Sequence, residues 1–215
     1  MTPLLSRLRA AGPICVAVLA AATPSLAHAT GEAAAAPAEE GLHVALGLGV
    51  AYSAVELSAG SDTTIDGFAP AFLGELGYHW GGLTAGIFVR PAATLGPRLS
   101  VDGPDPETRN LRLFEMPFGV FVNFYPGGGW FVQPRIGGSY ASVHDDAEVV
   151  SGSGVGFHAG FSIGWEHGLS GKWRLGVSGG AGYSFFPSKF EQPPGTDMLD
   201  ANWLTPSLLV SVGYH

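Results

Sequence analysis

Strict alternation between large apolar and small residues is the feature that most constrains the fold of this chain. The stretch KWRLGVSGGAGYS spans residues 172–184, and alternate positions carry mainly large apolar side chains, namely Trp173, Leu175, Val177, Ala181 and Tyr183. A period of two predicts a β-strand, because successive side chains point to opposite faces. The other face consists of Arg174 followed by glycines and serines. Soluble sheets seldom use glycine there, so this face indicates different surroundings.

The same alternation recurs in eight segments. We predict strands at about residues 42–53, 68–79, 83–93, 111–125, 130–142, 154–167, 172–185 and 203–214. Connections after the even-numbered segments are short and those after the odd-numbered segments are long, which predicts an antiparallel up-and-down meander. Five prolines fall within these segments and lack a donor for the sheet, so they predict bulges or strand ends at Pro70, Pro91, Pro117, Pro134 and Pro206.

Aromatic residues gather near both ends of the predicted strands. Near the short turns these are Tyr78, Trp80, Phe124, Trp130, Trp165, Trp173 and Tyr214, and near the long loops Tyr52, Tyr140, Tyr183, Phe185 and Trp203. Outer-membrane barrels have such girdles, with short periplasmic turns and longer external loops. We therefore predict an all-β fold, an eight-stranded antiparallel up-and-down transmembrane β-barrel whose small face points inward. A soluble barrel or sandwich explains neither the girdles nor the small face.

The first residues have the features of a secretory signal peptide over residues 1–29. Arg7 and Arg9 precede an apolar run, and small residues end at Ala29. Cleavage there would remove Cys15, the only cysteine. Residues 30–40 are expected to form a flexible leader before a barrel domain at 41–215. With 18 acidic and 10 basic residues, nucleic acid is not an expected partner.

Six charged residues have the parity of the predicted interior. They are Glu75, Arg90, Glu115, Arg135, Glu166 and Arg174. Buried charges are costly unless paired, and adjacent strands bring Glu75 toward Arg90 and Glu166 toward Arg174. We predict a lumen salt-bridge network that closes the passage, with a proton or ion pathway as the alternative. Inward glycines predict local cavities at Gly47, Gly49, Gly86, Gly119, Gly137, Gly160, Gly180 and Gly182.

Residues suited to catalysis or metal binding are scattered along the chain. His43, His79 and His158 have inward parity without close ligand spacing, so no metal or other cofactor is predicted. Along a strand, Ser162 lies about 13 Å from His158, too far for direct pairing. Ser142 and His144 are closer and adjoin two aspartates, but such residues are common in loops. We expect no enzyme, with a lipid-modifying outer-membrane enzyme as a less favoured alternative.

Two segments carry a resemblance to a known family. LFEMPFGVFVNFYP, Leu113–Pro126, and the final LLVSVGYH look like strands of the small OmpA/OmpX-like outer-membrane β-barrel proteins. In that family the last strand alternates apolar residues and ends on an aromatic residue, which implies a signal for the barrel-assembly machinery. The matching positions here are Leu208, Val210, Val212 and Tyr214, while the following His215 departs from the pattern. The resemblance also implies the outer membrane of a Gram-negative cell, with its lipid and lipopolysaccharide as partners.

The long connections are acidic, which bears on the expected function. Their acidic residues are Glu56, Asp62, Asp66, Asp145, Asp146, Glu148, Glu191, Asp197 and Asp200, without the spacing of an EF-hand. We expect a structural or surface-interaction role through these external loops, with a ligand that the sequence does not identify. A narrow conduit for small or apolar solutes is the alternative.

Overall fold

The computed structural model describes residues 40–59, 61–94, 96–100, 107–108, 111–145, 151–191 and 198–215. The predicted signal peptide and nearly all of the predicted leader lie outside this part. The described strands are β1 (Gly41–Ala59), β2 (Ser61–Trp80), β3 (Leu83–Val89), β4 (Ala92–Thr94), β5 (Arg98–Ser100), β6 (Glu107–Thr108), β7 (Leu111–Gly127), β8 (Trp130–Asp145), β9 (Ser151–Gly168), β10 (Trp173–Glu191) and β11 (Met198–Tyr214). The described residues contain no helix that is both long and apolar enough to cross a bilayer.

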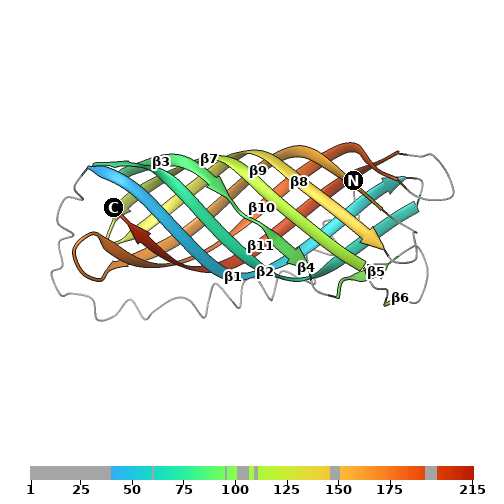
Figure 1. Cartoon of the computed structure of the whole chain (residues 1–215), viewed down its shortest axis with the longest axis horizontal. Helices are drawn as coiled ribbons and strands as arrows, with labels where there is room; N and C mark the ends of the chain where they lie inside the picture. Colours follow the sequence, from blue (N-terminus) through green and yellow to red (C-terminus); the bar gives the residue numbers. More distant parts are fainter. Residues whose placement is uncertain are drawn as a thin grey trace. The chain divides into compact units, whose positions relative to one another are not determined.

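Antiparallel pairing runs around a closed ring (Figure 1). β1 pairs with β2 on one side and with β11 on the other, so the first and last strands close the sheet. β3 and β4 occupy one position in the ring, because both pair with β2 and β7. β5 and β6 extend the sheet from β2. The predicted eight-stranded antiparallel barrel is confirmed.

Exposed apolar side chains cover the outer face, as the alternation predicts. Leu46 is 68% exposed, whereas the next residue along the strand, Gly47, points inward beside Leu73. The rings of Trp130 and Trp173 also lie on the outside. Trp203 is different: it was predicted to join the outer girdle, but it points into the barrel and is 1% exposed. The prediction for Trp203 is wrong because its position along β11 has inward parity.

The strands are longer than predicted, and the added residues lie at the long-loop end. β1 has 19 residues and β2 has 20, against about 9–11 for a strand that only crosses a bilayer. In the added part the apolar face changes sides: Val55 and Leu57 point inward and are buried, while Glu56 lies on the outer face. An outer face that meets water instead of lipid accounts for this inversion.

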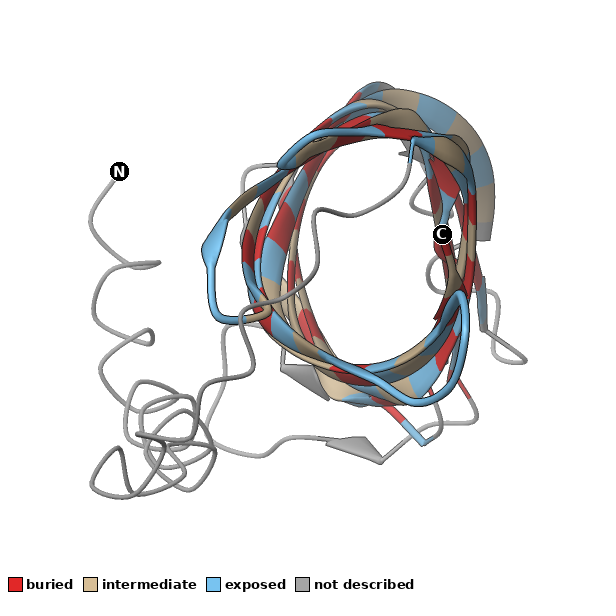
Figure 2. Ribbon diagram, turned by 90° about the vertical axis from the view of Figure 1, so that its left-hand side faces the viewer, coloured by how far each residue is buried: buried red, intermediate tan, exposed pale blue. Residues whose placement is uncertain are grey.

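Glycines face each other across the ladder inside the barrel. The pairs are Gly77 with Gly86, Gly119 with Gly137, and Gly160 with Gly182. A Cβ added at Gly119 would lie 2.2 Å from the main-chain oxygen of Ile136. At this pair the two backbones lie too close together for either residue to carry a side chain. Seen along the barrel, the ring of strands is oval (Figure 2). The contact at Gly119 is with the backbone of the adjacent strand, so the cavities predicted at Gly119 and Gly137 stay a prediction.

Four of the five strand prolines keep the register of their strands. Pro70, Pro117, Pro134 and Pro206 each align with a residue of a neighbouring strand, without a bulge at that position. A strand residue directs its main-chain donor toward one neighbour only, so a proline interrupts one ladder and leaves the other intact. The prediction of bulges or strand ends holds only at Pro91, which separates β3 from β4.

Candidate functional site inside the barrel

Buried inward side chains gather in several groups along the barrel, three of which concern the site. A histidine layer lies near the short turns, a Glu115 layer lies farther along the barrel, and a loop-end apolar cluster lies near the long loops. This order follows from the positions of their members along the strands: β1 contributes His43 near its start and Leu57 near its end.

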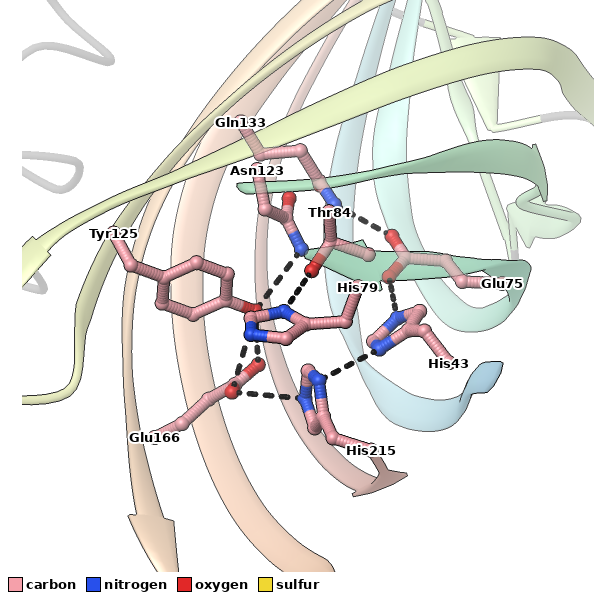
Figure 3. A network of polar contacts seen from close by, with 9 residues as sticks. All are labelled: His43, Glu75, His79, Thr84, Asn123, Tyr125, Gln133, Glu166 and His215. Carbon is pink, nitrogen blue, oxygen red and sulfur yellow. Dashed lines mark hydrogen bonds and ion pairs between the residues drawn. The ribbon is translucent and has the colours of Figure 1, made fainter. Parts of the chain in front are cut away.

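The histidine layer brings together residues from different strands, among them His43 of β1, Glu75 and His79 of β2, Glu166 of β9, and His215, which follows β11 (Figure 3). His43 Nε2 lies 3.4 Å from Glu75 Oε2, and His215 Nε2 lies 3.4 Å from Glu166 Oε2. The two Nδ1 atoms of these histidines are 3.4 Å apart. His79 stands beside them, with its ring centroid 5.0 Å from that of His215.

Uncharged polar groups complete the histidine layer. Gln133 Nε2 donates to Glu75 Oε1 at 2.7 Å, and Tyr125 Oη donates to Glu166 at 3.4 Å. His79 Nδ1 lies 2.7 Å from Thr84 Oγ1. Most of these groups are buried, and their contacts satisfy only part of the layer, because His79 Nε2 and His215 Nε2 have no hydrogen-bond partner in the described part of the chain.

The Glu115 layer is built around a carboxylate that is 1% exposed. Glu115 accepts hydrogen bonds from Ser184 at 2.6 Å, Thr205 at 2.8 Å and Ser139 at 3.2 Å. These donors come from three different strands, so one side chain ties β7 to β8, β10 and β11.

Two buried arginines and an imidazole lie with the Glu115 layer. Arg135 Nη2 donates to Ser162 at 2.7 Å, and the Arg135 guanidinium lies 5.7 Å from the ring centre of Phe88. Arg90 is 4% exposed and interacts electrostatically with Glu115, Glu75 and Arg135. His158 Nδ1 lies 2.8 Å from Ser184 Oγ.

The loop-end apolar cluster lies directly beyond the Glu115 layer. Each hydroxyl donor to Glu115 has an apolar residue two positions nearer the loops: Ala141 follows Ser139, Phe186 follows Ser184, and Trp203 precedes Thr205. The members are Val55, Leu57, Ile65, Leu111, Leu113, Ala141, Val143, Phe186, Ala201 and Trp203. A buried apolar cluster thus lies inside the barrel at this end.

The six charged residues predicted for the interior all have inward positions, but the partners of the glutamates differ from those expected. In the described part of the chain, the ion-pair partners of Glu75 and Glu166 are histidines. Glu75 aligns with Phe88 and Glu166 aligns with Gly176, so the nearest arginine on each adjacent strand is offset along the ladder. The closing role of the predicted network stays a prediction.

Sequence reasoning did not identify His215, Gln133 or Tyr125 as members of the interior network. His215 was treated as a departure from the terminal pattern, although it is 5% exposed and shares the inward parity of Leu209. Parity alone could have placed it inside. The partner of each side chain depends on the curvature of the ring, for which parity contains no signal.

The four residues of the predicted terminal signal lie on the other face of β11. Val210 is 53% and Val212 is 43% exposed on the outside. Tyr214 packs edge-on against Trp173, with ring centroids 5.4 Å apart. The alternation predicted for Leu208 through Tyr214 is therefore present in the strand, while its role in assembly stays a prediction.

The serine, histidine and carboxylate in the Glu115 layer are not arranged as a catalytic triad. In such a triad the carboxylate orients the imidazole, which then receives the proton of the serine. Here Ser184 donates to Glu115, and His158 contacts that same serine. Among the described residues, no group of three or more His, Cys, Asp or Glu side chains is arranged to hold a metal ion.

Comparison with known proteins adds a family match. A family model described as "Outer membrane protein beta-barrel domain" matches residues 14–215. No curated protein matches the chain. Among solved structures, the chain is similar to Neisserial surface protein A, with 11% identity, a TM-score of 0.46, and coverage of 82% of this chain and 98% of that one.

Two further solved structures have lower TM-scores. Ail of Yersinia pestis, the attachment invasion locus protein, has 14% identity and a TM-score of 0.36, with coverage of 82% and 99%. The outer membrane protease OmpT of Escherichia coli has 7% identity and a TM-score of 0.38, with coverage of 83% and 97%. These similarities are too low to argue a function from.

Proposed function

The chain belongs to the outer membrane protein β-barrel domain family, and on this premise we propose that it is a closed barrel with a structural or surface-interaction role. Its place is the outer membrane of a Gram-negative cell, which the family implies. In this proposal the short turns face the periplasm and the long loops face outward. Export would use a cleaved signal peptide, and insertion would use the barrel-assembly machinery.

The observation that carries the proposal is the burial of inward side chains at both ends of the barrel. An eight-stranded barrel encloses only enough space for its own side chains. Here a polar layer at one end and an apolar cluster at the other are both buried, with the Glu115 layer between them. A water-filled passage would need to cross an apolar core that ten side chains build.

The inverted apolar face supports a surface role. Where Val55 and Leu57 turn inward, the outer face carries Glu56, Asp66 and Arg112, which suit water better than lipid. Tyr52 donates a hydrogen bond to Asp66 at 2.5 Å, which orders this outer rim. The strands would thus stand above the membrane and hold the loops on a rigid base.

The acidic loops suggest the chemistry of a partner. Carboxylates on the outer rim and in the long connections would bind lipopolysaccharide phosphates through divalent cations, or would bind a cationic surface directly. This partner, together with the surrounding lipid, is part of the proposal.

Planar-bilayer recordings test the closed interior. We expect the purified protein to produce no steady conductance steps, recorded beside a pore of known conductance as a positive control. Stable steps from the unmodified protein would contradict the closed barrel and favour the narrow conduit.

A binding experiment tests the surface role. Proteoliposomes should bind lipopolysaccharide vesicles in Mg²⁺ and release them in EDTA, and a variant with Asp145, Asp146 and Glu148 changed to the corresponding amides should bind less. Equal binding by that variant and the unmodified protein would count against loop-mediated interaction.

A further inference from the structure

We propose that Arg90 and Arg135 form a binding site for a small monovalent anion in the interior of the barrel. Arg90 directly follows β3 and Arg135 lies on β8, and both side chains are buried, at 4% exposure each. The two guanidinium groups interact electrostatically with each other, so they belong to one region of the interior. This proposal does not depend on the surface role, and an anion that is held there does not need to cross the barrel.

Each arginine has a buried nitrogen without a hydrogen-bond partner in the described part of the chain. These nitrogens are Nη2 of Arg90 and Nε of Arg135. A guanidinium group only donates hydrogen bonds, so each of them needs an acceptor. Buried donors of this kind are costly unless an ion or an ordered water accepts from them. Water would supply an acceptor, whereas an anion also offsets the repulsion between the two positive groups.

The neighbouring carboxylates are occupied by other donors. Glu115, which interacts electrostatically with one of the arginines, accepts hydrogen bonds from three hydroxyl groups. Glu75, which interacts with both arginines, accepts one from Gln133 and lies 3.4 Å from His43 Nε2. A carboxylate has about four lone-pair positions, so these contacts use much of what the two glutamates can offer. The two glutamates balance the charge of the arginines without accepting from the two unpartnered nitrogens.

Gly160 leaves room for a ligand beside Arg135. A Cβ added at Gly160 would lie 3.4 Å from Arg135 Nε and 3.1 Å from His158 Nε2, so both nitrogens border the space over this bare backbone. Gly182, its partner across the ladder, has no side chain either. Guanidinium groups are weakly hydrated, and removing a multiply charged ion from water is costly. The site should therefore prefer chloride or bromide to sulfate.

His158 should make the site sensitive to pH. Ser184 donates its only hydrogen to Glu115, so its oxygen is left to accept the N–H of His158 Nδ1. A neutral His158 then turns the lone pair of Nε2 toward the space at Gly160, which disfavours an anion. A protonated His158 offers a third N–H there, and a bound anion would offset its repulsion from the two arginines, which interact with it electrostatically. Anion binding should therefore strengthen as the pH falls.

A crystal structure of the full protein grown in sodium bromide tests the site directly. We expect an anomalous bromide peak within hydrogen-bond reach of Arg90 Nη2 and Arg135 Nε. Water alone at this position, or bromide only elsewhere on the barrel, would overturn the proposal, even if no variant folded.

Thermal unfolding in lipid nanodiscs tests binding without a crystal. With ionic strength held constant by sodium sulfate, we expect sodium bromide to raise the unfolding midpoint until the site is saturated, and to raise it more at acid than at alkaline pH. Gly160→Ala should lose this rise, because its Cβ fills the space beside the two nitrogens while every charge is kept.

Gly168→Ala is the matched control for this experiment, since an added Cβ there has no neighbour within 4 Å. It should show the same rise as the unmodified protein, because general salt effects act on both alike. No rise in the unmodified protein, or an equal rise in Gly160→Ala, would overturn the proposal.

Discussion

Glu115 shows how a single residue connects the barrel interior. Its carboxylate accepts three hydroxyl hydrogen bonds and lies within electrostatic reach of Arg90. A buried carboxylate is costly to desolvate, and here three donors and a cation offset that cost. The predicted network of six charges did not include the hydroxyl groups, which are the direct hydrogen-bond partners of Glu115.

Replacing Glu115 should reveal its contribution to stability. We expect Glu115→Ala to lower the free energy of unfolding by about 3–5 kcal/mol, because it removes one of the two carboxylates that interact with the buried Arg90 and leaves three hydroxyls without this acceptor. Glu115→Gln should cost less, since its amide oxygen still accepts hydrogen bonds. Denaturant titrations in lipid vesicles, followed by tryptophan fluorescence, measure both, and equal midpoints for Glu115→Ala and the unmodified protein would contradict the assignment.

At the scale of the element, paired glycines allow neighbouring strands to approach closely. Gly119 and Gly137 face each other across the β7–β8 ladder. An added Cβ at Gly137 would lie 2.1 Å from the main-chain oxygen of Phe118, which no side-chain rearrangement can relieve. The small inward face predicted from the sequence is thus a requirement of the backbone as well as of the narrow interior.

This close approach predicts different effects for two glycine substitutions. Gly119→Ala should destabilise the barrel by about 1–3 kcal/mol, the usual cost of overpacking. Gly168→Ala is the control, because an added Cβ there has no neighbour within 4 Å. Unfolding midpoints measured in the same lipid should separate the two, and an equal loss for both would show that backbone approach is not the cause.

The two faces of the last strand, β11, have different surroundings. Tyr214 packs on Trp173 outside, whereas His215 lies inside the histidine layer. We expect Tyr214→Ala to reduce the amount of protein inserted in the membrane more than His215→Ala, because only Tyr214 occupies the aromatic position of the predicted assembly signal. Quantification of folded protein in outer-membrane fractions tests this order, and equal amounts would count against the signal.

At the scale of the whole molecule, the barrel has two regions along its length, which differ in the face that carries the apolar side chains. Apolar side chains face outward over most of its length and then face inward near the long loops. This inversion gives the loop end an internal core like that of a soluble protein.

The inversion predicts different effects for two tryptophans. Trp203→Ala should lower the free energy of unfolding by about 3–5 kcal/mol, as expected when a large side chain is removed from a packed core. Trp130→Ala should cost less, since its ring lies on the outer face with 39% exposure. Unfolding titrations in vesicles compare them, and a larger loss for Trp130→Ala would contradict an apolar core in the barrel.

Processing of the whole chain is a further prediction. If the signal peptide ends at Ala29, protein extracted from the outer membrane should begin at Thr30. N-terminal sequencing checks this, and retention of Arg7 and Arg9 in the extracted protein would refute it.

The sequence alone determined the strands, their faces and the closed barrel. Alternation is a local consequence of strand geometry, so Leu46 and Trp173 could be assigned to the outer face without knowledge of any partner. The even number of segments and their alternating short and long connections then favoured a closed meander. Near the long loops the apolar residues change to the inward face, so the alternation did not predict the residues at this end of β1, β2, β10 and β11 as part of the strands.

Only the tertiary structure decided which inward side chains meet. Glu115 binds Ser184 and Thr205, which lie 69 and 90 positions away along the chain, and His43 meets His215 at a separation of 172. Such contacts depend on the offset of each strand against the next, accumulated around the ring. The alternation of apolar and small residues predicts which face of the sheet a residue occupies. The closure of the sheet determines which side chain lies opposite it inside the barrel.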